Sequence, residues 1–156
     1  KGKTDPMGSD KKNPVSHIAY GYATQVVELD EEGFVSRVTA AHDVGRAVNP
    51  VSLSGQIEGG VVMGLGYALS EDFPLEQGRP TRKFGTLGLF KGAKTPPIDV
   101  IVVGRAKPDG LARGAKGVGE ICTIPTAPAV QNAYYNRDGV FRTKLPLEDT
   151  AYRPKP

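Results

Sequence analysis

The sequence predicts an α+β fold in which a mixed sheet packs against two main helices. β-branched and aromatic segments near the start are typical of strands, and two apolar stretches further along have helical spacing. The length of 156 residues fits one domain on the usual scale of about 150 residues. We therefore expect a single domain over 16–156, preceded by a polar tail or cut end over 1–15.

The predicted strands begin with a hairpin. HIAYGYATQVVEL (17–29) and FVSRVTAAH (34–42) both have strand character, and DEEG between them ends in Gly33, which can take a positive φ in a turn. IDVIVV (98–103) has the continuous apolar character of a buried strand. FRTKLPL (141–147) predicts a last strand near the end of the chain.

The first helix is predicted over Ser54–Glu71, after a loop marked by Asn49-Pro50. Ser54 is a suitable N-cap because its hydroxyl can accept a hydrogen bond from a free helical N–H group. The residues that share one face of this helix are Ile57, Val61, Leu65, Ala68 and Leu69.

The second helix is predicted from a cap at Thr126, with prolines around its first turn and Gly139 just past its end. The segment 73–97 between the helices is punctuated by Gly and Pro. It predicts an irregular surface or partner-contacting segment.

The first helix contains an unusual number of glycines. Gly59, Gly60, Gly64 and Gly66 each cost about 1 kcal/mol relative to Ala in a helix interior. Either close packing of another segment or a ligand lying along the backbone explains them.

Composition excludes several classes of function. The sequence has 20 Lys and Arg residues and 17 Asp and Glu residues. The basic residues are scattered along the chain, which does not favour nucleic-acid binding. One Cys and two His supply neither a disulfide framework nor a structural zinc site, so no metal ligand is predicted. No apolar run approaches the roughly 18 residues of a membrane span, and no signal peptide opens the sequence. We expect a cytoplasmic setting.

Common catalytic motifs do not fit. Gly114, Gly117 and Gly119 do not have nucleotide-binding spacing. Cys122 could act as a nucleophile only beside His17 or His42, and most lone cysteines are buried small hydrophobes. The neighbours His42 and Asp43 could form a catalytic pair, although a His in this position is more often a hydrogen-bonded structural residue.

The stretch GAKGVGEIC (114–122) contains the strongest chemical candidate, Glu120. Its glycines can turn the chain and bring backbone N–H groups close to a ligand. Packing against Ile121 and Cys122 would partly desolvate the carboxylate and favour its use as a general base. The alternative is a solvent-exposed Glu before a helix.

Four ordered motifs resemble the C-terminal part of the molybdopterin-binding subunit of the xanthine dehydrogenase family of molybdenum hydroxylases. They are HDVGRAVNP (42–50), GQIEGGVVMGLGYALSED (55–72), GAKGVGE (114–120) and IPTAPAVQNA (124–133), and the resemblance covers about 20–147. KFGTLGLFK (83–91) and LPLEDTAYR (145–153) are most similar to the selenium-dependent xanthine dehydrogenase, or purine hydroxylase, branch.

The resemblance implies roles for individual residues. Glu120 matches the family's base, which deprotonates a hydroxyl on molybdenum while hydride passes from the substrate to a sulfido or selenido ligand of the metal. Gln56 matches a position that contacts the pterin. The further residues implied in cofactor binding are Gly59, Gly60, Gly117, Val118 and Gly119.

The resemblance also implies partners. The upstream part of the same subunit would complete the pterin and substrate pockets, and FAD and iron-sulfur clusters would lie on other domains or subunits. We therefore expect this chain alone to bind neither cofactor nor substrate and to be inactive. Xanthine or a related purine is the expected substrate. The alternatives are a hydroxylase for aldehydes or other N-heterocycles, and a non-catalytic assembly module in which the Gly-rich helix and 73–97 form an interface.

Overall fold

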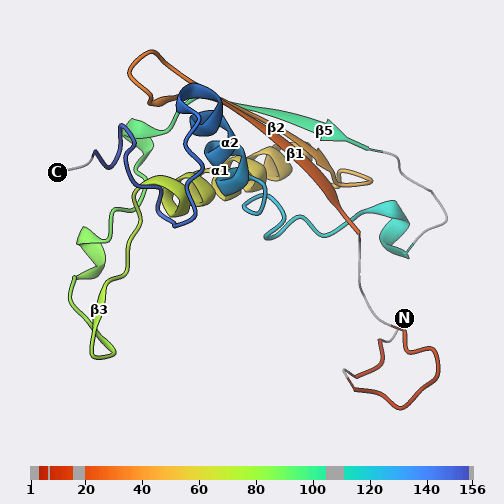
Figure 1. The fold of residues 1–156 in the computed structure, drawn as a ribbon. Helices are drawn as coiled ribbons and strands as arrows, with labels where there is room; N and C mark the ends of the chain where they lie inside the picture. Colours follow the sequence, from red (N-terminus) through yellow and green to blue (C-terminus); the bar gives the residue numbers. More distant parts are fainter. Residues whose placement is uncertain (1–3, 7, 16–19, 105–110, 155–156) are drawn as a thin grey trace.

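The computed structural model describes residues 4–6, 8–15, 20–104 and 111–154 (Figure 1). Its fold is α+β, with a mixed sheet and two main helices as predicted. The elements, in order, are β1 (Tyr22–Leu29), β2 (Val35–Asp43), α1 (Pro50–Leu69), β3 (Leu75–Glu76), β4 (Arg79–Pro80), β5 (Ile98–Val103) and α2 (Thr126–Asp138), with short 3-10 helices at Phe84–Thr86, Gly92–Lys94 and Leu111–Gly114.

The main sheet has the strand order β1-β2-β5. β1 and β2 form the predicted antiparallel hairpin, and Gly33 takes a φ of +93° in its turn. β5 pairs with β2 in parallel, so the connection between them crosses over through α1. The predicted start of the first strand at His17 falls in 16–19, outside the described residues, and the observed strand begins at Tyr22.

Both helices cover the same face of this sheet (Figure 1). α2 packs against β1, and α1 packs against α2 and β5. The five residues predicted to share one face of α1 are all fully buried. They pack with Val38 and Ala40 of β2 and Val130 of α2 to form the core. The helical periodicity therefore identified the buried face of α1 correctly.

The predicted start of the first helix is wrong by one turn. α1 begins at Pro50, and its N-cap is Asn49, whose side chain accepts a hydrogen bond from the N–H of Ser52. Proline suits the first helical position because its missing N–H group would have no helical partner there. The Asn-Pro pair therefore starts the helix and is not part of a preceding loop, and Ser54 lies inside α1.

Close packing explains two of the helix glycines. A Cβ atom added to Gly60 would lie 2.5 Å from Cβ of Cys122, and one added to Gly64 would lie 2.5 Å from Cβ of Thr126. A Cβ atom at Gly59 would meet nothing within 4 Å. The glycines thus let the segment 122–126 lie directly against α1, whereas the backbone at Gly59 is open.

α2 ends as predicted, because Gly139 takes the left-handed conformation with a φ of 72° just after the last helical residue. Its predicted cap is wrong. Thr126 is the first helical residue, and its hydroxyl donates to Oε1 of Gln25 instead of capping the helix.

The segment 141–147 does not form the predicted strand. The Arg142 side chain donates hydrogen bonds to nearby backbone carbonyls, those of Val140, Glu148 and Asp149. The segment still reaches the core, because Leu147 is fully buried and its N–H donates to the carbonyl of Ala68 on α1.

β5 has the predicted bounds but is not the buried strand expected. It is an edge strand of the main sheet, and Ile101, Val102 and Val103 are all exposed by 40% or more. The segment 73–97 is irregular as predicted, with a hairpin of two-residue strands and two 3-10 helices.

Glycine substitutions in α1 test the packing argument. Gly60→Ala and Gly64→Ala would each place a methyl group inside the contact distance of Cys122 or Thr126, and we expect each to lower the free energy of unfolding by about 1–3 kcal/mol. Gly55→Ala is the control, because nothing lies within 4 Å of its added Cβ. It should instead stabilise the helix by about 0.5–1 kcal/mol, measured by urea unfolding. Equal changes in the free energy of unfolding at the three positions would contradict the close approach of the segment 122–126 to α1.

Candidate functional site

The segment 114–122 is held against the end of β2. Ala115 forms an isolated β-bridge with Gly45, and the N–H of Arg46 donates to the carbonyl of Gly114. Nζ of Lys116 lies 2.5 Å from Oδ2 of Asp43 and also lies over the ring of Tyr22. These contacts fix the first half of the turn that carries Glu120.

Gln56 joins α1 to the second half of this turn. Its Nε2 donates to the carbonyl oxygen of Gly119 over 2.8 Å. The two residues are 63 positions apart, and the sequence predicted both as cofactor-binding residues. The structure brings them together and leaves Oε1 of Gln56 as the group that can accept a hydrogen bond from a ligand.

Gln25 of β1 makes a third connection, which the sequence reasoning missed. This buried side chain donates from Nε2 to the carbonyl of Cys122 over 2.8 Å and accepts at Oε1 from the hydroxyl of Thr126 over 2.7 Å. A signal was present, because Gln25 occupies an inward position of the alternating strand, in phase with Val27 and Leu29.

Glu120 is exposed, so its carboxylate does not pack against Ile121 and Cys122, and the alternative of a solvent-exposed Glu before a helix holds for this chain. Both neighbours are used elsewhere. Ile121 lies against the backbone of Gly21, and Cys122 packs under Gly60 of α1. The backbone around the carboxylate is open, because added Cβ atoms at Gly117 and Gly119 would meet nothing within 4 Å.

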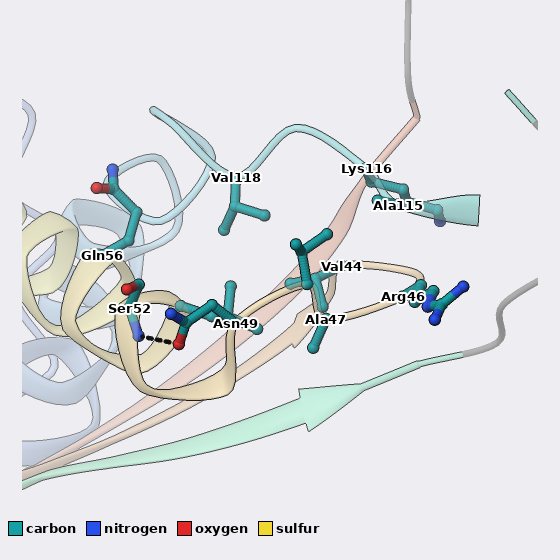
Figure 2. A pocket seen from close by; sticks show the side chains of 11 residues that line it. Val44, Arg46, Ala47, Asn49, Ser52, Gln56, Ala115, Lys116 and Val118 are labelled. Carbon is teal, nitrogen blue, oxygen red and sulfur yellow. Dashed lines mark hydrogen bonds between the residues drawn. The ribbon is translucent and has the colours of Figure 1, made fainter. Parts of the chain in front are cut away.

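A cavity of about 270 Å³ lies between the turn and the start of α1. Figure 2 shows that its walls come from three segments: the chain after β2, the first turns of α1 and the chain before Glu120. Its residues are Val44, Arg46, Ala47, Val48, Asn49, Ser52, Leu53, Gln56, Ala115, Lys116 and Val118. Val118 and Gln56 thus face the same cavity, and Glu120 follows Val118 by two residues.

Among the described residues, neither alternative catalytic group forms, and His17, one possible partner of Cys122, lies outside them. Asp43 binds Lys116 and the N–H of Gly45, not its neighbour His42. His42 is 1% exposed, and neither ring nitrogen has a hydrogen-bond partner among the described residues, so the expected hydrogen-bonded histidine is also wrong. Burial lowers the pKa of His42, which favours its neutral form.

Cys122 has the character of a buried structural thiol. Its Sγ donates to the carbonyl of Val118 over 3.2 Å, and burial raises its pKa above the ordinary thiol value. A thiol held in its protonated form is a poor nucleophile. Within the described ranges, no group of three or more His, Cys, Asp and Glu side chains could hold a metal ion. No helix in the described part of the chain has the length and apolar character needed to cross a membrane.

Comparison with known proteins identifies the family. The model of the family described as "Molybdopterin cofactor-binding domain" matches residues 3–96, which is more than half of the chain. The chain belongs to this family. The matched range includes β1, β2 and α1 with Gln56, and ends before the Glu120 turn.

The relatives confirm the resemblance found in the sequence. The chain is 32% identical over 136 residues to a probable xanthine dehydrogenase subunit of Bacillus subtilis, an alignment that covers 84% of this chain and 18% of the relative. It is 34% identical over 142 residues to the gamma subunit of the 6-hydroxypseudooxynicotine dehydrogenase complex of Paenarthrobacter nicotinovorans, covering 86% and 18%. The chain thus spans about a fifth of the length of these relatives.

A solved structure has the same fold with appreciable sequence identity. The aldehyde oxidoreductase from Desulfovibrio gigas matches with a TM-score of 0.59 and 34% identity, and the match covers 70% of this chain and 12% of that protein. The α+β architecture is therefore that of part of a molybdopterin-binding subunit.

The ion pair of Lys116 and Asp43 predicts a pH dependence of stability. The hydrogen bonds from Lys116 and then from the N–H of Gly45 lower the pKa of Asp43 below its ordinary value of 3.8. A carboxyl whose pKa is lowered by folding stabilises the fold above its unfolded pKa, and this contribution is lost as the pH falls through the folded pKa. We expect Asp43→Asn to be less stable than the unaltered chain at about pH 7, with a difference that shrinks toward about pH 3.

The measurement is urea unfolding of both proteins across this pH range. Lys116→Met provides the matched comparison, because the Asp43→Asn substitution should cost far less in that background. A constant difference between the two proteins at every pH would show that the Asp43 carboxylate does not stabilise the turn.

Proposed function

We propose that this chain forms one wall of the active site of a molybdenum hydroxylase, in which Glu120 is the general base. The observation that carries the proposal is the hydrogen bond from Gln56 to Gly119. It fixes the residue before Glu120 to the helix that the family match includes, while the carboxylate itself stays exposed.

The residues around the cavity fit a molybdopterin. Oε1 of Gln56 can accept a hydrogen bond from the polar edge of a pterin, and Arg46 places positive charge at the cavity wall for an anionic group. The charge of Lys116 is already paired with Asp43. Gly55 and Gly59 leave the backbone of α1 open, as Gly117 and Gly119 do in the turn. Gly60 is different, because Cys122 covers it. We therefore assign Gly60 to supporting the turn. The other predicted cofactor-binding residues keep that proposed role: Gln56, Gly59, Gly117, Val118 and Gly119.

The chemistry assigned to this chain is proton transfer. A bound molybdenum cofactor would supply the oxidising centre and the oxygen for the substrate carbon. The carboxylate of Glu120 would accept the proton released in the reaction, and the open backbone at Gly117 and Gly119 would let the turn lie close to the cofactor. A base acts only within hydrogen-bond reach of the proton it removes, so the contacts that fix the turn are part of the mechanism.

The upstream part of the same subunit is the proposed partner that completes the site. The outer face of the sheet supports this proposal, because neither helix covers it and it presents Val26, Ile101 and Val103, which are 47% to 55% exposed. Apolar side chains gathered on one sheet face are typical of a surface that another part of the protein covers. Packing of the upstream part against this chain would also remove water from Glu120, which is exposed in this chain.

Xanthine or a related purine is the proposed substrate. The relatives include proteins named for xanthine and for aldehydes, so aldehydes and other N-heterocycles are the alternatives. The selenium-dependent branch, the iron-sulfur and flavin partners, the cytoplasmic location and the single domain over 16–156 belong to the same proposal.

Glu120→Gln in the complete enzyme tests the proposal. The amide fills the same space but cannot accept the proton, so we expect kcat to fall by about 10²- to 10⁴-fold while molybdenum content is unchanged. Glu32→Gln is the control, because it removes an exposed carboxylate from the turn between β1 and β2, away from the Glu120 turn and from the outer face of the sheet.

The same experiment separates the catalytic proposal from a non-catalytic assembly module. Unchanged turnover in Glu120→Gln with intact metal content would leave Glu120 without a catalytic role and would favour the module. Loss of molybdenum from Glu120→Gln would instead show that the residue holds the cofactor site together.

A further inference from the structure

The Glu120 turn is connected to the sheet by one buried side chain, Gln25. This residue is 8% exposed and lies on the inner face of β1, opposite Ala40 of β2. Both ends of its amide are used: Nε2 donates to the carbonyl of Cys122, and Oε1 accepts from the hydroxyl of Thr126. The two partners bracket the segment that runs from the turn into α2.

These bonds are expected to be strong determinants of the turn's position. The donor, the acceptor and the hydroxyl are all buried, and a buried polar group without a partner is destabilising. The same segment is pressed against α1, because Cys122 and Thr126 lie where side chains at Gly60 and Gly64 would be. The Cys122 end of the turn can therefore shift only if the Gln25 bonds break.

We propose that Gln25 is a positioning residue for Glu120, an inference that rests on the proposed function. Gln25 and Gln56 hold the turn from two sides. Gln56 holds the carbonyl of the residue before Glu120, and Gln25 holds the carbonyl of the second residue after it. The carboxylate itself is exposed, so its direction is set by the backbone on either side. Nothing in the motifs of the sequence assigns this role to β1.

The test uses Gln25→Leu and Thr126→Val in the complete enzyme. Gln25→Leu removes both bonds at similar volume, and Thr126→Val removes only the hydroxyl donor at nearly equal shape. We expect Gln25→Leu to lower kcat by about tenfold to a hundredfold, with KM and molybdenum content nearly unchanged, because a misplaced catalytic group costs turnover more than binding. Thr126→Val should lower kcat less than Gln25→Leu does. Thr126→Ser keeps the hydroxyl and should lower kcat least of the three.

Tyr134→Phe is the matched control. It removes another buried hydrogen bond between α2 and the hairpin, from the Tyr134 hydroxyl to the carbonyl of Gly33, at the opposite end of the hairpin from the Glu120 turn. Hydrogen exchange of the backbone amides of 118–126 gives a readout independent of catalysis. It should accelerate in Gln25→Leu and stay unchanged in Tyr134→Phe.

Each outcome has a defined meaning. Faster exchange in 118–126 together with a lower kcat supports the inference. Unchanged exchange in Gln25→Leu overturns it, as does an unchanged kcat in a folded, molybdenum-loaded Gln25→Leu or Thr126→Val enzyme when Glu120→Gln has lost turnover. An equal fall of kcat in Tyr134→Phe also overturns it, because the loss would then follow general destabilisation. If Glu120→Gln keeps full turnover, the proposed function fails and the positioning role fails with it.

Discussion

The close approach of the segment 122–126 to α1 is the constraint on which the rest of the structure depends. It requires glycine at two positions one helical turn apart, because a Cβ atom at Gly60 or Gly64 would lie 2.5 Å from Cys122 or Thr126. This contact sets where α2 begins and where the turn before it ends. It also brings Thr126 within reach of Gln25 on the sheet, so that the helices, the sheet and the turn are joined at one place.

The glycines of α1 serve two faces of the helix in different ways. On the inner face they allow packing, and on the outer face, at Gly55 and Gly59, they leave the backbone accessible. Of the two alternatives that the sequence could not separate, packing therefore accounts for Gly60 and Gly64, and ligand binding stays a proposal for Gly59. The helix cost of about 1 kcal/mol for each glycine is offset by packing contacts at Gly60 and Gly64.

Much of the fold could be predicted because its signals are local. The buried face of α1, the bounds of β5 and the turn glycines Gly33 and Gly139 all follow from periodicity or from a required positive φ. The start of α1 was missed because Asn-Pro is equally typical of a loop and of a helix cap followed by its first residue. The exposure of β5 could not be predicted either, because a continuous apolar strand does not say whether this chain or another part of the protein covers it.

For the candidate site, the sequence predicted residues but not the contacts between them. Four ordered motifs predict roles for Gln56, Gly119 and Glu120, and the structure joins the first two by a hydrogen bond. Gln25 was not found, because its partners lie 97 and 101 residues away and no local pattern encodes them. Glu120 is exposed, which is the alternative that the sequence left open. The sequence could not decide between the two environments, because desolvation depends on all the surfaces around a carboxylate, including any that the proposed upstream part would add.

Molybdenum content is the most direct test of the claim that this chain is one wall of a shared active site. It would be measured by elemental analysis on this chain alone and on the full-length subunit that carries it, both produced in a host that makes the pterin cofactor. We predict molybdenum stoichiometric with the full-length subunit and none in the chain alone. Molybdenum retained by the chain alone, or absent from a folded full-length subunit, would contradict it.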